Sequence, residues 1–184
     1  GLGHMGNYDG SADFNSQALF ANDSWDMSIM SYFSQWENPY TDATYSYIPT
    51  LMRADVAALN ELYSSYGYGT SNSFAGDTIY GFNTTISDYE SSIWNNFTNL
   101  VSNSSFTITD AGGNDTLDLS GFWSDQVVNL QAPEISDTAL IPSTVGDGGE
   151  TQNLFFAPGT VVENAFGGYG NDSIIGNSTN NHLK

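Results

Sequence analysis

The pattern of apolar and polar positions divides the chain into an irregular first part, one helix and a strand-rich second half. Residues 1–50 are rich in Gly, Asn, Ser, Asp and Tyr without a sustained period, which is typical of loops. Over residues 50–63 apolar side chains recur at helical spacing, and Thr50 is a candidate N-cap. The Gly- and Ser-rich segment 67–73 ends this pattern and predicts a boundary near residue 70.

Beyond that boundary, short runs of β-forming residues alternate with clusters of Gly, Asn and Asp, which predicts an all-β second half. The predicted strands include 78–80, 106–108, 125–130 and 159–163. We therefore expect a mainly β protein in two parts, with one helix in residues 1–69 and strands in residues 70–184.

One Gly- and Asp-rich turn carries a repeat signature. Residues 167–175 read GGYGNDSII and match the calcium-binding nonapeptide G-G-x-G-x-D-x-U-x at every defined position. Weaker copies occupy 110–118 and 176–184, and the latter has Asn181 where the repeat has Asp. A single Gly-Asn-Asp cluster is equally compatible with an ordinary β-turn. A complete nonapeptide followed by a degraded copy favours calcium.

The chemistry of such a turn explains this preference. Glycines allow a tight turn that aims carbonyls inward, and the Asp adds an anionic oxygen. Calcium takes about 6 to 8 oxygens, so two neighbouring turns must share one ion. Because two nonapeptides make one coil, the stacking partner of turn 168–172 is expected about eighteen residues later, beyond residue 184. We therefore expect that site to be incomplete.

Charge and composition narrow the range of partners. The chain has 2 Lys plus Arg against 21 Asp plus Glu, a net charge of −19, which excludes nucleic acid and anionic membranes as electrostatic partners and favours cations. It has no Cys, so disulfides and thiolate zinc sites are excluded. A hard metal ion is then a candidate for stabilising the fold in their place. No stretch approaches about 18 consecutive apolar residues, so we expect no membrane insertion.

The opening residues carry a second metal signal. A vector remnant would explain Gly3-His4-Met5. However, residues 1–4 also fit G-x-x-H, the last four positions of the metzincin zinc motif H-E-x-x-H-x-x-G-x-x-H. The segment Ser28-Ile29-Met30-Ser31-Tyr32 follows at the distance of a Met-turn. We therefore expect the sequence to begin inside the motif and to be a fragment.

On these motifs the chain resembles the serralysin family of secreted bacterial zinc proteases. Further family-like segments follow in the same order: Gly6-Asn7-Tyr8, Leu62-Tyr63, Gly76-Asp77-Thr78 and Glu163-Asn164-Ala165. The resemblance implies the C-terminal part of a metzincin catalytic domain over 1–69. It also implies a truncated calcium-binding parallel β-roll or β-sandwich domain over 70–184.

The resemblance also implies roles for single residues. His4 would be a zinc ligand, Tyr32 a further ligand that stabilises the transition state, and Met30 the apolar base beneath the metal. The other two histidines and the general-base glutamate are expected to lie outside this sequence, so the chain alone should be inactive. The implied calcium ligands are Gly76 and Thr78 with Asp110, Gly112 and Asp115, then Gly113 and Asp115 with Val161 and Glu163, then Gly168, Gly170 and Asp172.

The resemblance implies an intact parent that hydrolyses peptide bonds of extracellular proteins. It would bind protein or peptide substrates, not nucleic acid, remain a monomer, and leave the cell by a bacterial type I-like route. The alternative is a non-catalytic calcium-binding β-roll that serves structure or secretion, with His4 incidental. An H-E-x-x-H segment directly upstream of residue 1 would decide for the protease.

Overall fold

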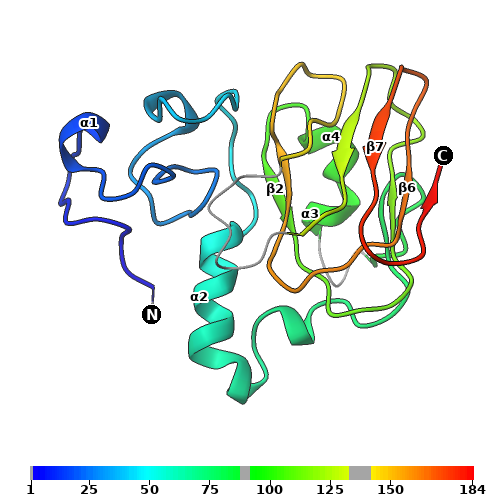
Figure 1. Ribbon diagram of the computed structural model, residues 1–184, viewed down its shortest axis with the longest axis horizontal. Coiled ribbons are helices and arrows are strands. Elements are labelled where there is room, and N and C mark those ends of the chain that lie inside the picture. The colour runs from blue at the N-terminus through cyan, green and yellow to red at the C-terminus, as the bar shows by residue number, and fades with distance from the viewer. Residues whose placement is uncertain (1, 88–91, 133–141) are drawn as a thin grey trace.

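Short parallel strands dominate the second half of the chain, and loops with one long helix make up the first (Figure 1). The computed structural model describes residues 2–87, 92–132 and 142–184. The described helices are α1 (Phe14–Gln17), α2 (Arg53–Tyr63), α3 (Ser92–Asn95) and α4 (Phe97–Leu100), with 3₁₀ turns at Gln35–Glu37, Ser64–Tyr66 and Thr70–Asn72. The described strands are β1 (Ile79–Gly81), β2 (Phe106–Ile108), β3 (Thr116–Asp118), β4 (Val127–Asn129), β5 (Leu154–Phe156), β6 (Asn164–Phe166), β7 (Ser173–Ile175) and β8 (His182–Leu183).

The strands wind back and forth between a four-stranded sheet and two smaller pairs. The sheet has the order β1-β3-β6-β8, and the pairs are β2 with β5 and β4 with β7, all parallel. Ser143 and Thr144 form antiparallel bridges to β5 and β4 respectively and so link the two pairs. In the last coil, Asn164 pairs with His182, eighteen residues on. This register equals the length of two nonapeptides.

The core lies between the sheet and the pairs. Tyr80, Leu117 and Ala165 of the sheet belong to the same buried cluster as Phe106 and Phe156 of the pairs. Each of these side chains is at most 1% exposed. Since burying a large apolar side chain contributes about 1.5–3 kcal/mol, this cluster stabilises a domain whose strands are only two or three residues long.

The predicted all-β second half is wrong at α3 and α4. In this stretch Trp94, Phe97 and Val101 recur at helical spacing and are buried. The Trp94 ring lies 5.1 Å from the Tyr80 ring, between centroids, so the helices fill the core beside β1. Two short helices with buried apolar side chains therefore lie within a part of the chain that was predicted to be all β.

The strand predictions have mixed outcomes. The run 106–108 is confirmed as β2, and the runs 78–80 and 125–130 overlap β1 and β4. The predicted strand 159–163 is wrong, because Gly159 has a φ of 84° within a turn and the strand starts only at Asn164.

The predicted helix over 50–63 is confirmed as α2, but it begins at residue 53 and Thr50 does not cap it. The Thr50 Oγ1 instead accepts a hydrogen bond from the Thr107 backbone N–H at 2.9 Å. The carboxylate of Asp55, within the first turn, accepts from the Met52 N–H at 2.9 Å. Asp55 thus satisfies a free amide at the helix start, where a negative charge also complements the helix dipole.

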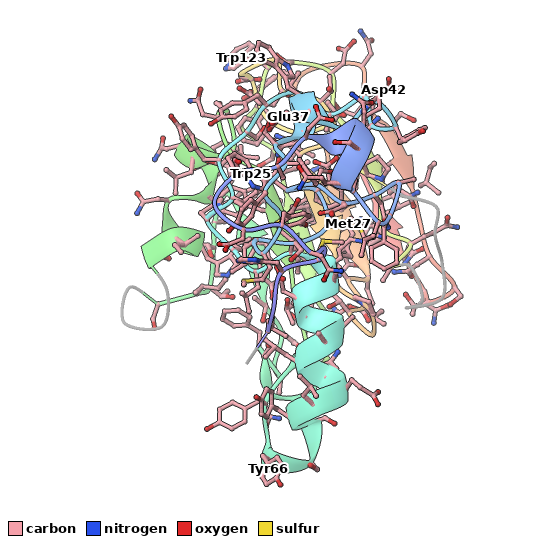
Figure 2. All side chains as sticks on the ribbon, turned by 90° about the vertical axis from the view of Figure 1, so that its left-hand side faces the viewer. Trp25, Met27, Glu37, Asp42, Tyr66 and Trp123 are labelled. Atoms are coloured by element: carbon pink, nitrogen blue, oxygen red, sulfur yellow. The ribbon has the colours of Figure 1, made fainter. Side chains whose placement is uncertain are left out.

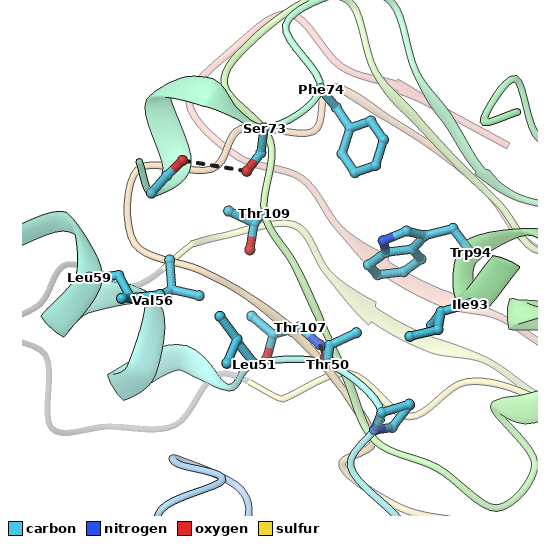
Figure 3. A pocket seen from close by; sticks show the side chains of 12 residues that line it. Thr50, Leu51, Val56, Leu59, Ser73, Phe74, Ile93, Trp94, Thr107 and Thr109 are labelled. Carbon is cyan, nitrogen blue, oxygen red and sulfur yellow. Dashed lines mark hydrogen bonds between the residues drawn. The ribbon is translucent and has the colours of Figure 1, made fainter. Parts of the chain in front are cut away.

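The first part packs against the second at several places. Besides the contact of Thr50, Thr70 Oγ1 donates to the Pro158 carbonyl at 3.3 Å, and Tyr47 forms a parallel bridge with Ser104. A pocket of about 340 Å³ lies between α2 and the strands (Figure 3). Its lining is apolar and hydroxylic, with no titratable side chain, so it offers no acid or base for chemistry.

Figure 2 places Tyr66 beyond the end of α2, at one end of the molecule, and Trp123 at the other. Both rings are largely exposed. The described residues contain no helix long and apolar enough to cross a membrane.

Candidate metal centres

Four turns stack along one edge of the four-stranded sheet, because each turn directly precedes one of its strands. They are turns 76–78, 110–115, 160–163 and 177–181, in the strand order β1-β3-β6-β8. We call the space between two successive turns a gap. Parallel pairing without register slips places equivalent backbone atoms on the two sides of each gap.

Asp115 occupies the centre of this stack. Its Oδ1 accepts a hydrogen bond from the Thr78 N–H at 2.8 Å, and its own N–H donates to Glu163 Oε2 at 2.8 Å. The side chain is fully buried, yet Oδ2 has no hydrogen-bond partner. A buried carboxylate oxygen without a donor is costly unless a cation or proton satisfies it.

A second buried carboxylate lies in the same turn. Asp110 is fully buried, and its Oδ1 accepts from the Gly112 N–H at 2.8 Å. Its Oδ2 accepts from the Tyr80 hydroxyl at 2.7 Å. Tyr80 comes from β1 in the neighbouring coil, so this hydrogen bond ties two coils together beneath the turn.

The carboxylates in this stack oppose one another electrostatically. The pKa of Asp115 is raised to about 7, mainly by burial; the Thr78 N–H lowers it, and the charges of Asp110 and Glu163 and the contact with the Asp110 carboxyl raise it. Burial likewise raises the pKa of Asp110. Both shifts mean that the protein without a cation holds these groups in their ionised form at a cost.

Two glycines allow the close approach of the turns. Gly112 and Gly113 have φ values of 137° and 153°, which side-chain-bearing residues rarely adopt. A Cβ on Gly113 would lie 2.6 Å from the Gly76 carbonyl oxygen of the neighbouring turn. The backbone of turn 110–115 therefore lies directly against the carbonyl that the sequence analysis expected to share an ion with it.

Turn 167–172 has a neighbour on the side of β4, while its expected partner about eighteen residues later, beyond residue 184, stays a prediction. Since β7 pairs with β4, the turn before β7 stacks on the turn before β4. Asp172 Oδ1 accepts from the Gln126 N–H at 2.8 Å, and Asp125 Oδ1 accepts from the Asn171 N–H at 2.7 Å. A Cβ on Gly170 would lie 2.5 Å from the Ser124 carbonyl oxygen.

This stacking was missed because turn 122–126 lacks the repeat signature, with Ser124 where the nonapeptide has glycine. Beside these hydrogen bonds, the rings of Trp123 and Tyr169 stack at 4.3 Å, between centroids. The structure therefore brings Gly168, Gly170 and Asp172 beside a real turn of the chain, on the other edge from Asp115.

The residues of the zinc prediction meet on the surface of the first part. The ring centroids of His4 and Tyr32 are 4.6 Å apart, with His4 exposed and Tyr32 half-buried. The Tyr32 hydroxyl accepts from the Gly10 N–H at 3.4 Å. Met30 is half-buried in the turn before Tyr32. The structure thus brings His4 and Tyr32 together.

Two buried carboxylates, which the sequence did not single out, accept hydrogen bonds from the segment around Met30 and Tyr32. Asp55 accepts from the Ser28 hydroxyl at 2.6 Å and from the Ile29 N–H at 2.9 Å. Asp23 accepts from the Ser31 hydroxyl and from the Tyr8 hydroxyl, each at 2.7 Å. Only the position of Asp55 in the first turn of a predicted helix gave a sequence signal.

The Tyr8 hydroxyl, which donates to Asp23, is in a buried environment. Burial and the hydrogen bond to Asp23 raise the pKa of Tyr8 to about 12, so its hydroxyl stays protonated and donates. The Tyr8 ring lies 4.7 Å from Tyr32, between centroids, and so supports it from one side.

The donor sets fit calcium better than zinc. Within the described part of the chain, no three His, Cys, Asp or Glu side chains converge as a metal site. Calcium accepts backbone carbonyls together with few carboxylates, and turn 110–115 offers the unpartnered Asp115 Oδ2 and lies against the Gly76 carbonyl of the neighbouring turn. Zinc needs three or four protein ligands or water, and the chain has only 2 histidines and no Cys. The residues present therefore fit calcium but not a complete zinc site.

The chain is similar to known metalloproteases along its whole length. The family described as "Peptidase M10 serralysin C terminal" matches residues 70–183. The chain is 37% identical over 193 residues to the metallopeptidase AprA of Pseudomonas marginalis, which covers 100% of this chain and 36% of the relative. It is 34% identical over 187 residues to serralysin of Proteus mirabilis, which covers 100% of this chain and 34% of the relative. The chain belongs to the serralysin C-terminal family of M10 peptidases.

Serralysin of Photorhabdus luminescens is 36% identical over 190 residues, again with 100% of this chain and 35% of the relative covered. The chain spans about a third of the length of the curated relatives it matches. The resemblance to serralysins is therefore confirmed at the level of the family, and the parts of the relatives outside this third are not represented in the structure.

Proposed function

We propose that this chain is part of a secreted, calcium-stabilised zinc metalloendopeptidase that hydrolyses peptide bonds of extracellular proteins. Residues 1–69 would contribute the end of the catalytic domain, and residues 70–184 a calcium-binding parallel β-roll. The family membership of residues 70–183 and the names of the relatives support a protease parent.

The unpartnered, fully buried Asp115 Oδ2 is the observation that carries the calcium part of the proposal. Asp115 lies between two turns, so its carboxylate can face an ion in either gap. The first would involve Gly76, Thr78, Asp110 and Gly112, and the second Gly113, Val161 and Glu163. When bound, calcium would supply positive charge that keeps these carboxylates ionised without mutual repulsion.

On the other edge, Gly168, Gly170 and Asp172 are the proposed ligands of a third ion. Asp172 is only half-buried, and its Oδ1 already accepts from the Gln126 N–H. Asp172 therefore has a weaker need for a cation than Asp115, although it lies in the better repeat motif. We expect Asp115 to dominate the calcium response of this chain.

In the proposed catalytic part, His4 and Tyr32 would hold zinc and Met30 would lie beneath it. When bound, zinc would supply Lewis-acid activation of the scissile carbonyl. Tyr32, whose ring packs against Tyr8, would donate a hydrogen bond from its phenol hydroxyl to the reacting carbonyl. The further ligands and the general base are not among the residues of this chain.

Calcium-dependent melting tests the proposal. The wild type should melt at a higher temperature in excess calcium than in excess chelator. The reason is that an ion present at one hundred times its Kd adds about 2.7 kcal/mol per site to the free energy of unfolding. Asp115→Asn should lose most of that rise, whereas Asp42→Asn, which removes a charge outside the turn stack, should keep it. A wild type that melts identically in calcium and chelator would refute the calcium roll.

The second candidate is a calcium-binding structural or secretion module without catalysis. The unpartnered Asp115 Oδ2 supports this candidate as much as the first, because the module needs calcium but no zinc. Both candidates share the calcium response, so the upstream coding sequence separates them. An H-E-x-x-H segment directly before residue 1 supports the protease, and unrelated β repeats there would leave only the module.

A further inference from the structure

The last gap of the turn stack differs chemically from the other two. Asp115, Glu163 and Asn181 each come directly before strand positions that pair in one row of the sheet, so the three residues form a column. Glu163 thus has an amide as its neighbour on one side and a carboxylate on the other. An amide carries N–H donors, and a carboxylate has none.

The Asn181 amide nitrogen lies among three oxygens. Asn181 Nδ2 is 2.9 Å from the Glu163 carbonyl oxygen, 2.8 Å from Asn177 Oδ1 and 3.1 Å from Thr179 Oγ1. Asn181 Oδ1 accepts from the Asn177 backbone N–H at 2.9 Å. That backbone donor fixes the orientation of the amide, because a flipped side chain would oppose two N–H groups.

A second amide closes the rest of the gap. Asn177 Nδ2 donates to the Val162 carbonyl at 2.8 Å and to the Leu130 carbonyl at 3.3 Å. The carbonyls of residues 162 and 163, which face turn 177–181, are therefore both occupied by side-chain N–H groups. Neither carbonyl therefore needs a cation as a partner.

We propose that the Asn181 amide takes the place of a calcium ion in the gap between turns 160–163 and 177–181, so that this gap is held together without metal. The inference rests on the proposed function, in which the gaps on either side of Asp115 take calcium. Carbonyl and side-chain oxygens around one centre are the ligands that calcium prefers. Here an N–H donor group satisfies them at hydrogen-bond distances.

Replacing Asn181 by Asp would exchange these donors for an anionic acceptor. The carboxylate oxygen that replaces Nδ2 would then face the Glu163 carbonyl and Asn177 Oδ1 with no proton between them, which is repulsive without a cation. With calcium, the same oxygens would form part of a coordination shell. Asn181→Asp should therefore make the last coil calcium-dependent, which the wild-type coil is not.

The test uses the full 184-residue chain and three variants, with melting temperature and calcium bound per chain as readouts. Asn180→Asp is the matched control, since it makes the same change at the exposed neighbouring residue. In chelator, Asn181→Asp should melt about 2–4 °C below Asn180→Asp. In excess calcium the difference should disappear, and Asn181→Asp should bind one more ion. Asn181→Ala should melt lower than wild type by the same amount in both conditions.

Equal melting of Asn181→Asp and Asn180→Asp in chelator would overturn the inference, because the amide donors would then not hold the gap. A deficit that calcium does not reduce would also overturn it. These outcomes are separate from failure of the proposed function, which would appear as a wild type that binds no calcium. In that case the comparison in chelator still decides whether the amide holds the gap.

Discussion

Asp26 is a buried acid outside the turn stack. It is 1% exposed, and neither of its carboxylate oxygens has a hydrogen-bond partner. Burial raises the pKa of Asp26 to about 6, and the nearby Thr41 and Ser24 hydroxyls and the charge of Arg53 lower it by less than burial raises it. A single nearby cation is thus not enough to offset the loss of water around this carboxylate.

The raised pKa makes Asp26 a source of pH-dependent stability. Its folded-state pKa of about 6 exceeds the ordinary value of 3.8, so the folded state holds the proton more tightly than the unfolded state. The stabilising contribution is therefore complete below about pH 4 and lost as the pH rises through about 6. We expect this loss to reach about 3 kcal/mol by pH 7.

Urea unfolding of wild type and Asp26→Asn at pH 4 and pH 7, in chelator, measures that loss. As the pH rises from 4 to 7, the unfolding free energy of the wild type should fall relative to that of Asp26→Asn. A difference that is the same at both pH values would show that Asp26 does not titrate over this range. Comparing the two proteins cancels the titration of the other carboxylates.

At the scale of elements, Asp55 ties the start of α2 to the turn before Tyr32. One carboxylate accepts from Ser28, Ile29 and Met52, and the residue is 2% exposed. Helix α2 is therefore not only a packing element. Its first turn fixes the backbone of the segment that contains Met30.

We expect Asp55→Ala to lower the free energy of unfolding by roughly 2–4 kcal/mol, because it leaves several buried donors unsatisfied at once. Glu61→Ala is the matched control, since it removes an exposed carboxylate from the same helix. Denaturant unfolding of both variants gives the comparison. If Asp55→Ala cost no more than Glu61→Ala, the tie between α2 and the turn would be energetically unimportant.

At the scale of the whole molecule, the two histidines lie in different parts of the chain. His4 lies beside Tyr32, and His182 belongs to β8, with its ring 5.2 Å from Phe166 between centroids. Both turns of each gap beside Asp115, where we propose calcium, belong to this chain, whereas the proposed zinc site has one histidine and one tyrosine.

We therefore expect this chain to bind zinc weakly and to leave casein uncleaved in the presence of calcium, because a zinc site needs at least three protein ligands. Calorimetric titration with zinc, with His4→Ala as control, measures the first part. A submicromolar site that depends on His4 would contradict the expectation. So would casein cleavage that a chelator abolishes.

Local patterns in the sequence were enough to predict the features that depend on residues close together along the chain. Helical spacing identified α2, a short β-branched and aromatic run identified β2, and the motifs identified the serralysin family. The nonapeptide located turn 167–172, and its eighteen-residue spacing is the register of β6 on β8. These features are encoded within windows of about ten to twenty residues.

Only the tertiary structure decided which turns face each other. Turn 122–126 lies beside Asp172 on the side of β4, and no repeat pattern in the sequence predicted that neighbour. The helices α3 and α4, and the carboxylates Asp23 and Asp55, likewise gained their roles from distant contacts. Pairing between strands more than forty residues apart depends on which apolar faces can be buried together, and no local pattern contains that information.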